Sequence, residues 1–322
     1  MPVVITSNIQ SMIVQKNLRI ATKSLDVAIE RMTTGYKINH ASDNAAGHSI
    51  STSWITKLGS LDVVAENASM GNDLLRTAEE NYSLITSHLQ RIRDLTEQAS
   101  SGTYGSKSLK AIQSEIKSRL EEITRISANA EFNDIKLMSN TIPASGLNIQ
   151  VGLDASSDSI ISLSNTIFGD ASVKGLFGSN TDFMNIVKKA NNNQAVTNIN
   201  SEEGYTAVSA ALSGLKKKAD GSYVIQTETG CLPKDTLSAI DKALSEIDGR
   251  VTKLGSAQNR LDSAFSSIEV RTENLTSSLS TIRDADVAEE SSHYIQAQIL
   301  QQASATLLAT ANQAPSIALS LV

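Results

Sequence analysis

The sequence predicts a mainly α-helical protein. We expect a long antiparallel helical bundle or coiled coil built from both chain termini, with a small β-hairpin and a small α/β variable domain in the middle. Two long seven-residue repeats of apolar residues, one in each half of the chain, indicate helices that pack through narrow seams. Aromatic residues make up only 4% of the 322 residues, which favours long helices over a large compact core.

Composition excludes several classes of function. The net charge is −6 and charges of both signs are interleaved, so no nucleic-acid partner is expected. No apolar run is long enough to cross a bilayer, so no membrane partner is expected. Cys231 is the only cysteine, which leaves no intrachain disulfide. The N-terminus lacks the basic and apolar stretches of a secretory signal, so composition alone favours a cytosolic protein.

No motif for chemistry is present. The four histidines are scattered, and neither a zinc-protease motif nor a phosphate-binding loop occurs. We therefore expect no enzyme activity, no cofactor and no metal site.

The N-terminal stretch predicts one amphipathic helix followed by a link. A row of apolar residues recurs every seven positions: Leu18, Leu25 and Met32. Gly35 is expected to end this helix. The link contains three candidate N-caps for the next helix: Asn39, Ser42 and Asp43.

Two much longer helices follow from the seven-residue rows. The first row lies in residues 54–99 and includes Leu75, Tyr82 and Leu89. The second row lies in residues 240–282 and includes Leu254, Leu261 and Ile268. Two seams of equal length in one chain most simply pack on each other, so these six residues are the predicted intramolecular seam. Gly59 and Gly71 of the first helix are expected at points of close helix–helix approach, with a functional bend of the helix as the alternative.

Shorter elements are predicted between the two seams. A third helix is expected over residues 106–130, and alternating residues at 147–151 and 159–163 predict a hairpin. The loop-rich stretch from 169 to 232 contains helical patches at 181–190 and 205–218 and a strand-like run at 223–227. Pro233 is expected to open the second long helix.

Both chain ends are unusual in their lack of charge. Neither residues 1–15 nor residues 291–322 contain a single Asp, Glu, Lys or Arg. The C-terminal helix still carries a wide apolar face, with the largest residues at Ile295, Ile299, Leu300 and Leu307. Such ends suit burial where amides are tolerated but charge is not. We therefore expect a polymer subunit whose ends pack side by side while the middle of each chain points outward.

Four segments of the sequence resemble bacterial flagellin. Residues 28–47, AIERMTTGYKINHASDNAAG, are similar to the family pattern E-R-L-S-S-G-x-R-I-N-x-A-x-D-D-A-A-G. EFNDIKL at 131–137 resembles E-F-N-x-x-K-L, and LGSAQNR at 254–260 resembles L-G-A-x-Q-N-R. QILQQA at 298–303 and LATANQAP at 308–315 resemble the C-terminal helix. The matches cover roughly residues 1–165 and 235–322, in the family's order.

This resemblance implies a structural role. Flagellins polymerise into the hollow filament that drives bacterial swimming, with terminal helices in an inner tube and long helices in an outer tube. It implies an extracellular filament protein exported through the flagellar type III channel without a cleaved signal peptide, which replaces the cytosolic expectation. Implied partners are further copies of the chain, an export chaperone at the C-terminal helix (residues 291–322), and hook-associated and cap proteins. The implied inner-core packing residues are Leu18, Leu25, Met32, Ile295, Ile299, Leu300 and Leu307.

The same resemblance divides the chain into three parts. Residues 1–43 and 283–322 are the implied inner core, 44–168 and 235–282 the rod with its hairpin, and 169–234 a small variable surface-exposed region. The main alternative is a hook–filament junction protein, which shares the terminal helices. A cytosolic coiled-coil protein would carry charged chain ends, which this sequence lacks.

One surface segment suggests a further partner. Residues 90–95 resemble the flagellin segment recognised by the animal Toll-like receptor for flagellin, and Arg91, Leu95 and Glu115 occupy matching positions. The simpler interpretation is that these are helix-surface residues that contact the next subunit. The two roles are compatible.

Overall fold

The computed structural model describes residues 8–101, 103–139, 141–154, 156–191, 194–196, 198–218, 223–225 and 234–320. Cys231 and Pro233 lie outside the described residues. Contacts divide the chain into two compact units. The terminal unit comprises residues 1–61 and 269–322, and the central unit comprises residues 62–268. The three-part division made from the sequence stays a prediction.

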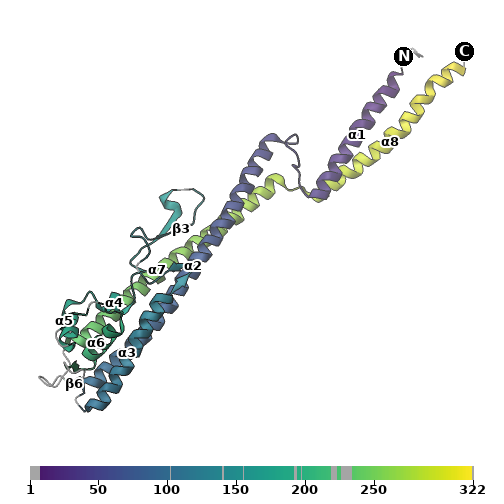
Figure 1. Cartoon of the computed structure of the whole chain (residues 1–322). Coiled ribbons are helices and arrows are strands. Elements are labelled where there is room, and N and C mark those ends of the chain that lie inside the picture. Colours follow the sequence, from purple (N-terminus) through teal and green to yellow (C-terminus); the bar gives the residue numbers. More distant parts are fainter. Residues whose placement is uncertain are drawn as a thin grey trace. The chain divides into compact units, whose positions relative to one another are not determined.

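The terminal unit is built mainly from α1 (Ile9–Thr34) and α8 (Val287–Ser320), which lie side by side and antiparallel (Figure 1). Asn8 caps α1 by accepting a 3.0 Å hydrogen bond from the Ser11 amide. Gly35 ends α1 with φ of +75°, as the sequence predicts, and its amide donates to the Arg31 carbonyl.

The two links that join α1 and α8 to the rest of the chain are tied together. Lys37 donates its amide hydrogen to the Arg283 carbonyl at 2.6 Å, and Ala285 donates to the Gly35 carbonyl at 2.9 Å. The Arg283 guanidinium lies 3.7 Å from the centre of the Tyr36 ring. These contacts join residues about 250 positions apart, so the sequence pattern does not reveal them.

The cap of α2 (Ala45–Ser100) differs from the sequence prediction. The Asn44 side chain accepts the Gly47 amide at 2.9 Å, so Asn44 takes the place expected for Asn39, Ser42 or Asp43. Asp43 instead accepts amide hydrogens from His40 and Asn39 within the link. These hydrogen bonds hold the pKa of the Asp43 carboxyl below its usual value, and the bond from the His40 amide has the largest effect.

The central unit packs part of α2 against α3 (Ser106–Asn129) and part of α7 (Lys234–Arg283). β3 (Leu147–Gln150) and β4 (Ile160–Leu163) form the predicted antiparallel hairpin, with the short helix η1 (Ser157–Ser159) before β4. A second, minimal pair joins β1 (Glu131–Phe132) and β2 (Ile135–Lys136). An added Cβ at Gly71 would lie 2.5 Å from Ile149 of β3 and 3.2 Å from Leu261 of α7, which confirms the expected close approach. At Gly59, no atom of the described residues lies within 4 Å of an added Cβ, so the prediction of a close helix–helix approach is wrong for this glycine.

The variable stretch folds onto the same core. It contains α4 (Val173–Phe177), α5 (Thr181–Ala190) and α6 (Glu202–Leu212), followed by β5 (Leu215–Lys217) paired with β6 (Tyr223–Ile225). α6 packs on α3 and α5, and the rings of Phe177 and Phe183 pack in a tilted arrangement with their centres 5.3 Å apart. The prediction of a helical patch over 205–218 is wrong at its C-terminal end. Gly214 adopts φ of +69°, and the chain turns there into β5.

Candidate assembly surface

The contact between α1 and α8 is made by small side chains. The buried residues of α1 are Ser11, Ala21 and Ala28. From α8, Ala297 and Ser304 are buried at matching seven-residue spacing. Hydrogen bonds join the helices at Asn8 to the Ala311 carbonyl (2.8 Å), Ser11 to Asn312 (2.8 Å) and Gln301 to Thr22 (3.3 Å). Small residues let two helices approach closely but bury little apolar area.

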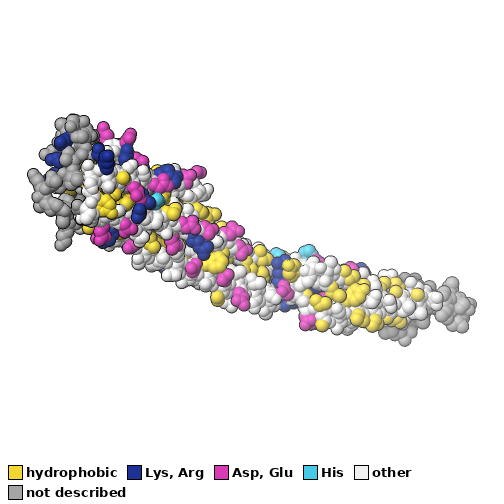
Figure 2. All heavy atoms as spheres, turned by 90° about the horizontal axis from the view of Figure 1, so that it is seen from below, with side chains coloured by type: hydrophobic (Ala, Val, Ile, Leu, Met, Phe, Trp, Pro, Cys, Tyr) yellow, Lys and Arg dark blue, Asp and Glu magenta, His cyan; other side chains and the backbone are white. Residues whose placement is uncertain are grey.

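Large apolar side chains of both helices face outward instead. Ile299 is 60% exposed and Leu307 is 57% exposed. Others on the same two helices are Ile9, Met12, Ile13, Ile20, Ile29, Met32, Ile295 and Leu300. Figure 2 shows hydrophobic side chains spread over α1 and α8, toward the right of the view, with few charged side chains among them. An apolar surface of this extent marks a site of protein–protein contact.

The seven residues implied as inner-core contacts all lie on this helix pair. Leu18 and Leu25 are half-buried on α1, and Met32 is exposed near its end. The four residues from α8 are all exposed: Ile295, Ile299, Leu300 and Leu307. The structure thus places the seven on one pair of helices, and their role in contacts between copies stays a prediction.

A groove of about 720 Å³ runs between α1 and α8 on one side. Its apolar lining includes Ile20 and Val27 from α1 and Ala297, Leu300 and Leu307 from α8. At one end Arg31 and Glu290 form an ion pair at 3.6 Å. Sequence reasoning missed this groove, because it depends on which faces of two helices at opposite chain ends turn toward each other.

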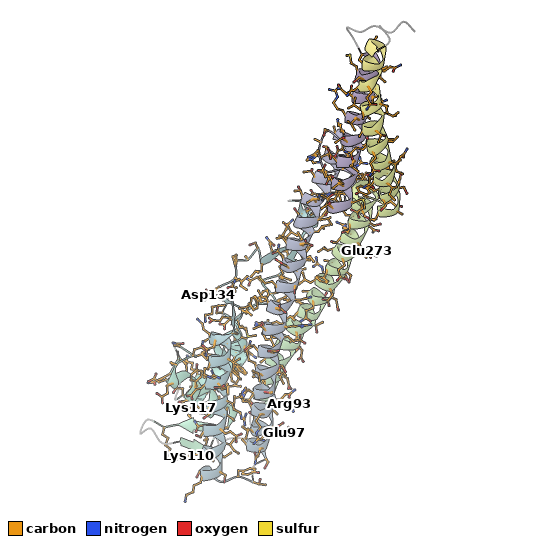
Figure 3. All side chains as sticks on the ribbon, turned by 90° about the vertical axis from the view of Figure 1, so that its right-hand side faces the viewer. Arg93, Glu97, Lys110, Lys117, Asp134 and Glu273 are labelled. Carbon is orange, nitrogen blue, oxygen red and sulfur yellow. The ribbon has the colours of Figure 1, made fainter. Side chains whose placement is uncertain are left out.

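The six residues of the predicted intramolecular seam lie in the central unit and are at most 4% exposed. Three polar contacts between α2 and α7 give their register: Asn72 to Asp262 (2.6 Å), Gln258 to Glu79 (3.0 Å) and Arg93 to Asp241 (2.8 Å). Partner numbers fall along α7 as they rise along α2, so the two helices are antiparallel here. Figure 3 shows Arg93 next to Glu97 on α2, where the two form a 3.5 Å ion pair.

The segment that resembles the receptor epitope forms a charged network between α2 and α3. Arg91 donates to Glu115 at 3.1 Å, and Arg119 donates to the same carboxylate at 3.0 Å. Partial desolvation opposes ionisation of Glu115, but the two arginines together hold its pKa below the usual value. Leu95 is only 2% exposed and lies in the core. Of the three named residues, Arg91 and Glu115 are therefore the ones with surface to offer a partner.

In the described part of the chain, no three His, Cys, Asp or Glu side chains gather in a way that could hold a metal ion. Among the same residues, no helix combines the length and apolar character that a bilayer span requires.

The long helices and the exposed apolar helix pair are typical of a structural protein that assembles through protein–protein contacts. Residues 5–142 match the bacterial flagellin N-terminal helical region, and residues 237–322 match the bacterial flagellin C-terminal helical region. The chain therefore belongs to the bacterial flagellin family.

Whole-chain relatives agree with these matches. Flagellin B of Vibrio cholerae is 29% identical over 378 residues, and polar flagellin B/D of Vibrio parahaemolyticus is 30% identical over 380 residues. Flagellin C of Vibrio anguillarum is 29% identical over 380 residues. Each alignment covers 100% of both chains. The crystal structure of Bacillus cereus flagellin is similar with 20% identity and a TM-score of 0.39, over 63% of this chain and 88% of that one.

Membership of this family gives the function in outline. The chain is a structural subunit of the extracellular flagellar filament and not an enzyme. It polymerises with copies of itself. Nothing among the similar proteins favours the alternative of a hook–filament junction protein.

Proposed function

We propose that α1 and α8 are the segments through which copies polymerise, forming the inner core of the filament. The observation that carries this proposal is the inverted packing of the pair, with alanine and serine inside and isoleucine, leucine and methionine outside. A helix pair built to be stable alone would bury its large residues. Here that burial is left for neighbouring copies to complete.

The energetics fit reversible assembly. Each exposed isoleucine or leucine contributes roughly 1–2 kcal/mol when a neighbour covers it. Eight isoleucine and leucine side chains are exposed on α1 and α8, together with Met12 and Met32, enough to offset the entropy that a subunit loses on joining a polymer. The absence of charge on residues 291–322 removes the desolvation cost that buried charges would add.

Seeded polymerisation tests this role. Monomers carrying Ile299→Gln or Leu307→Gln are added to sheared filament fragments, and the critical concentration is measured by sedimentation. We expect a rise of about tenfold or more for each, since a lost apolar contact of about 1.4 kcal/mol changes an equilibrium tenfold. Leu153→Gln, an exposed leucine outside both family matches, is the control. Normal assembly of both α8 variants would reject the proposal.

The remaining parts of the chain receive their roles from this assignment. Residues 44–168 and 235–282 form the rod outside the inner core, and residues 169–234 face solvent on the filament. The buried seam of Leu75, Tyr82, Leu89, Leu254, Leu261 and Ile268 holds the rod together. Filaments formed after a small tag is inserted near residue 192 would display it on their outer surface, and a tag hidden from antibody would contradict the division.

Several partners follow from the same apolar helix. Before assembly, the exposed face of α8 needs cover, and an export chaperone that binds residues 291–322 would supply it. Export through the flagellar type III channel without a cleaved signal peptide, and contacts with hook-associated and cap proteins, complete this route. A peptide of residues 291–322 should compete for the chaperone, and equal binding by a chain truncated at residue 290 would argue against this site.

A second candidate partner is an animal Toll-like receptor that recognises flagellin. The support is the exposed pair of Arg91 and Glu115, which fix each other's position at 3.1 Å. Leu95 would act from the core by supporting this surface. Monomer carrying Arg91→Glu should lose receptor signalling, while Lys188→Glu in the variable stretch should not. Unchanged signalling by the Arg91 variant would exclude the receptor role.

A further inference from the structure

Charge is distributed unevenly along the α1–α8 pair. The half nearer the chain ends carries three basic residues, Lys16, Arg19 and Lys23, and its stretch of α8 carries no charged residue. All three are exposed, and none forms an ion pair with any described residue. This half of the pair therefore presents a net positive surface that the subunit itself does not neutralise.

The opposite half is acidic. Residues 26–37 and 283–290 contain six acidic and three basic residues. Of the basic ones, Arg31 already pairs with Glu290, and Arg283 stacks on Tyr36. Asp286 caps α8 through the amides of Ala288 and Glu289, and the Glu289 side chain reaches only His293 at 3.7 Å. Negative charge thus remains available at this end.

The groove between α1 and α8 connects the two halves. Lys23 lines it from the basic half, and Arg31, Glu290 and His293 line it from the acidic half. The Nε atom of Arg31 is buried without a hydrogen-bond acceptor among the described residues. A buried N–H of this kind is costly unless an incoming group supplies an acceptor.

We propose that the groove receives the α1–α8 pair of a second copy that is displaced along the helix axis. In this arrangement Lys16, Arg19 and Lys23 of one copy face Asp286 and Glu289 of the next. The ion pair of Arg31 with Glu290 shows that Glu290 lies level with Arg31. Asp286 and Glu289 therefore lie roughly 14 residues beyond Arg19, which corresponds to a displacement of about 20 Å at 1.5 Å per residue.

This inference rests on the proposed polymerisation through α1 and α8 and adds a register to it. Apolar contacts alone are non-directional and leave the axial position of neighbouring copies open. An unshifted side-by-side contact would place basic residues against basic residues and acidic against acidic. Complementary charges contribute only modest affinity when they are exposed, but they favour one axial register of the two copies over the alternatives.

The test uses the full chain in seeded polymerisation, with the variants Lys23→Glu and Glu289→Lys. At about 50 mM salt we expect each single variant to raise the critical concentration about 5-fold. At about 0.5 M salt the difference should shrink, because the charges are screened. Lys188→Glu and Glu203→Lys, both exposed in the variable stretch, are the matched controls.

A mixture of the two variants separates contacts between copies from contacts within one copy. Copies with Lys23→Glu are acidic at positions 23 and 289, and copies with Glu289→Lys are basic at both of these positions. Because the two kinds of copy are complementary neighbours, an equal mixture should assemble close to the wild-type level. Pairing within one chain predicts rescue in the double variant only. The proposed register would be overturned if the single variants had the wild-type critical concentration, or if the mixture assembled no better than the single variants. If the α8 apolar variants also assembled normally, the polymerisation role itself would fail.

Discussion

Arg250 of α7 donates a 2.7 Å hydrogen bond from Nη1 to the carbonyl oxygen of Gly169, in the turn between the hairpin and α4. The same guanidinium reaches the Asp170 carbonyl at 3.2 Å and the Glu246 carboxylate at 2.6 Å. From the other side, the Tyr82 hydroxyl of α2 donates to the Ile167 carbonyl at 2.6 Å. The two long helices thus hold the turn from which the variable stretch begins.

Replacing Arg250 should loosen this turn. The residue is 8% exposed, so Arg250→Met leaves two carbonyls and one carboxylate without their donor. We expect a loss of about 2–4 kcal/mol in the free energy of unfolding, measured by urea denaturation. Glu246→Gln is the control, because the Glu246 side chain is 45% exposed and its loss should cost less than about 1 kcal/mol. Equal effects of the two variants would contradict the role of the carbonyl contacts.

Thr96 of α2, unlike Arg250, carries a buried polar group that is not hydrogen-bonded among the described residues. It is fully buried, yet its hydroxyl has no hydrogen-bond partner among the described residues. Thr96→Val keeps the shape and removes the unsatisfied group, so we expect about 1 kcal/mol of added stability. Thr77→Val serves as the comparison, since the Thr77 hydroxyl donates to the Asp73 carbonyl at 2.9 Å and its removal should not stabilise. A lower melting temperature for Thr96→Val would show that the hydroxyl has a partner in solution.

Gly71 and Gly249 form a matched pair of helix glycines in the central unit. Gly249→Ala should add up to about 1 kcal/mol of stability through helix propensity, because no atom of the described residues lies within 4 Å of the new Cβ. Gly71→Ala gains the same propensity but pushes Ile149 and Leu261 away, so a net loss of about 1–2 kcal/mol is expected. Urea midpoints of the two variants measure the difference. A stabilising Gly71→Ala would mean that the hairpin adjusts freely.

The sequence predicts the long helices well, because a seven-residue row of apolar side chains fixes both the element and the face that it buries. Leu75 and Leu254 lie in the core for this reason. The hairpin is equally visible, since Leu147–Gln150 alternates and its partner lies close in the chain. Gly35 ends α1 because a left-handed residue is needed there.

Other features escape sequence reasoning for physical reasons. The helix α6 ends early because Gly214 turns the chain into β5, although the residues around it suit a helix. The α1–α8 contact uses alanine and serine, while a hydrophobic pattern suggests leucine and isoleucine at the contact. Arg283 stacks on Tyr36 across most of the chain length. The last two depend on partners far away in the chain, which no local period encodes.

Acidification should weaken the central unit through His88. Burial, together with the positive charge of Arg119 whose Nη1 lies 3.4 Å away, lowers the pKa of His88, and the nearby Glu122 opposes the shift only in part. A histidine with a lowered pKa stabilises the fold above its ordinary pKa near 6.5 and loses that contribution as the pH falls through this range. The free energy of unfolding should therefore fall between about pH 7.5 and 5.5.

His88→Gln removes this part of the pH dependence. The variant should lose less stability than the wild type over the same interval, as measured by urea unfolding at both pH values. His48→Gln, which lies in the terminal unit, should leave the pH dependence of the central unit unchanged. If the His88 variant lost as much stability as the wild type, another group would have to carry the effect.

The terminal helices should be the first part of an isolated subunit to open. α1 buries only Ser11, Ala21 and Ala28, so the pair gains little apolar burial against the entropy of ordering two long helices. Brief protease treatment of monomer should trim about residues 1–43 and 283–322, leave the central unit intact and abolish seeded polymerisation. In assembled filaments the same residues should resist cleavage, because neighbouring copies cover Ile299, Leu307 and the other exposed apolar side chains. Mass spectrometry of the fragments identifies the cut sites. Cleavage that is equally fast in monomer and filament would mean that assembly does not order these helices.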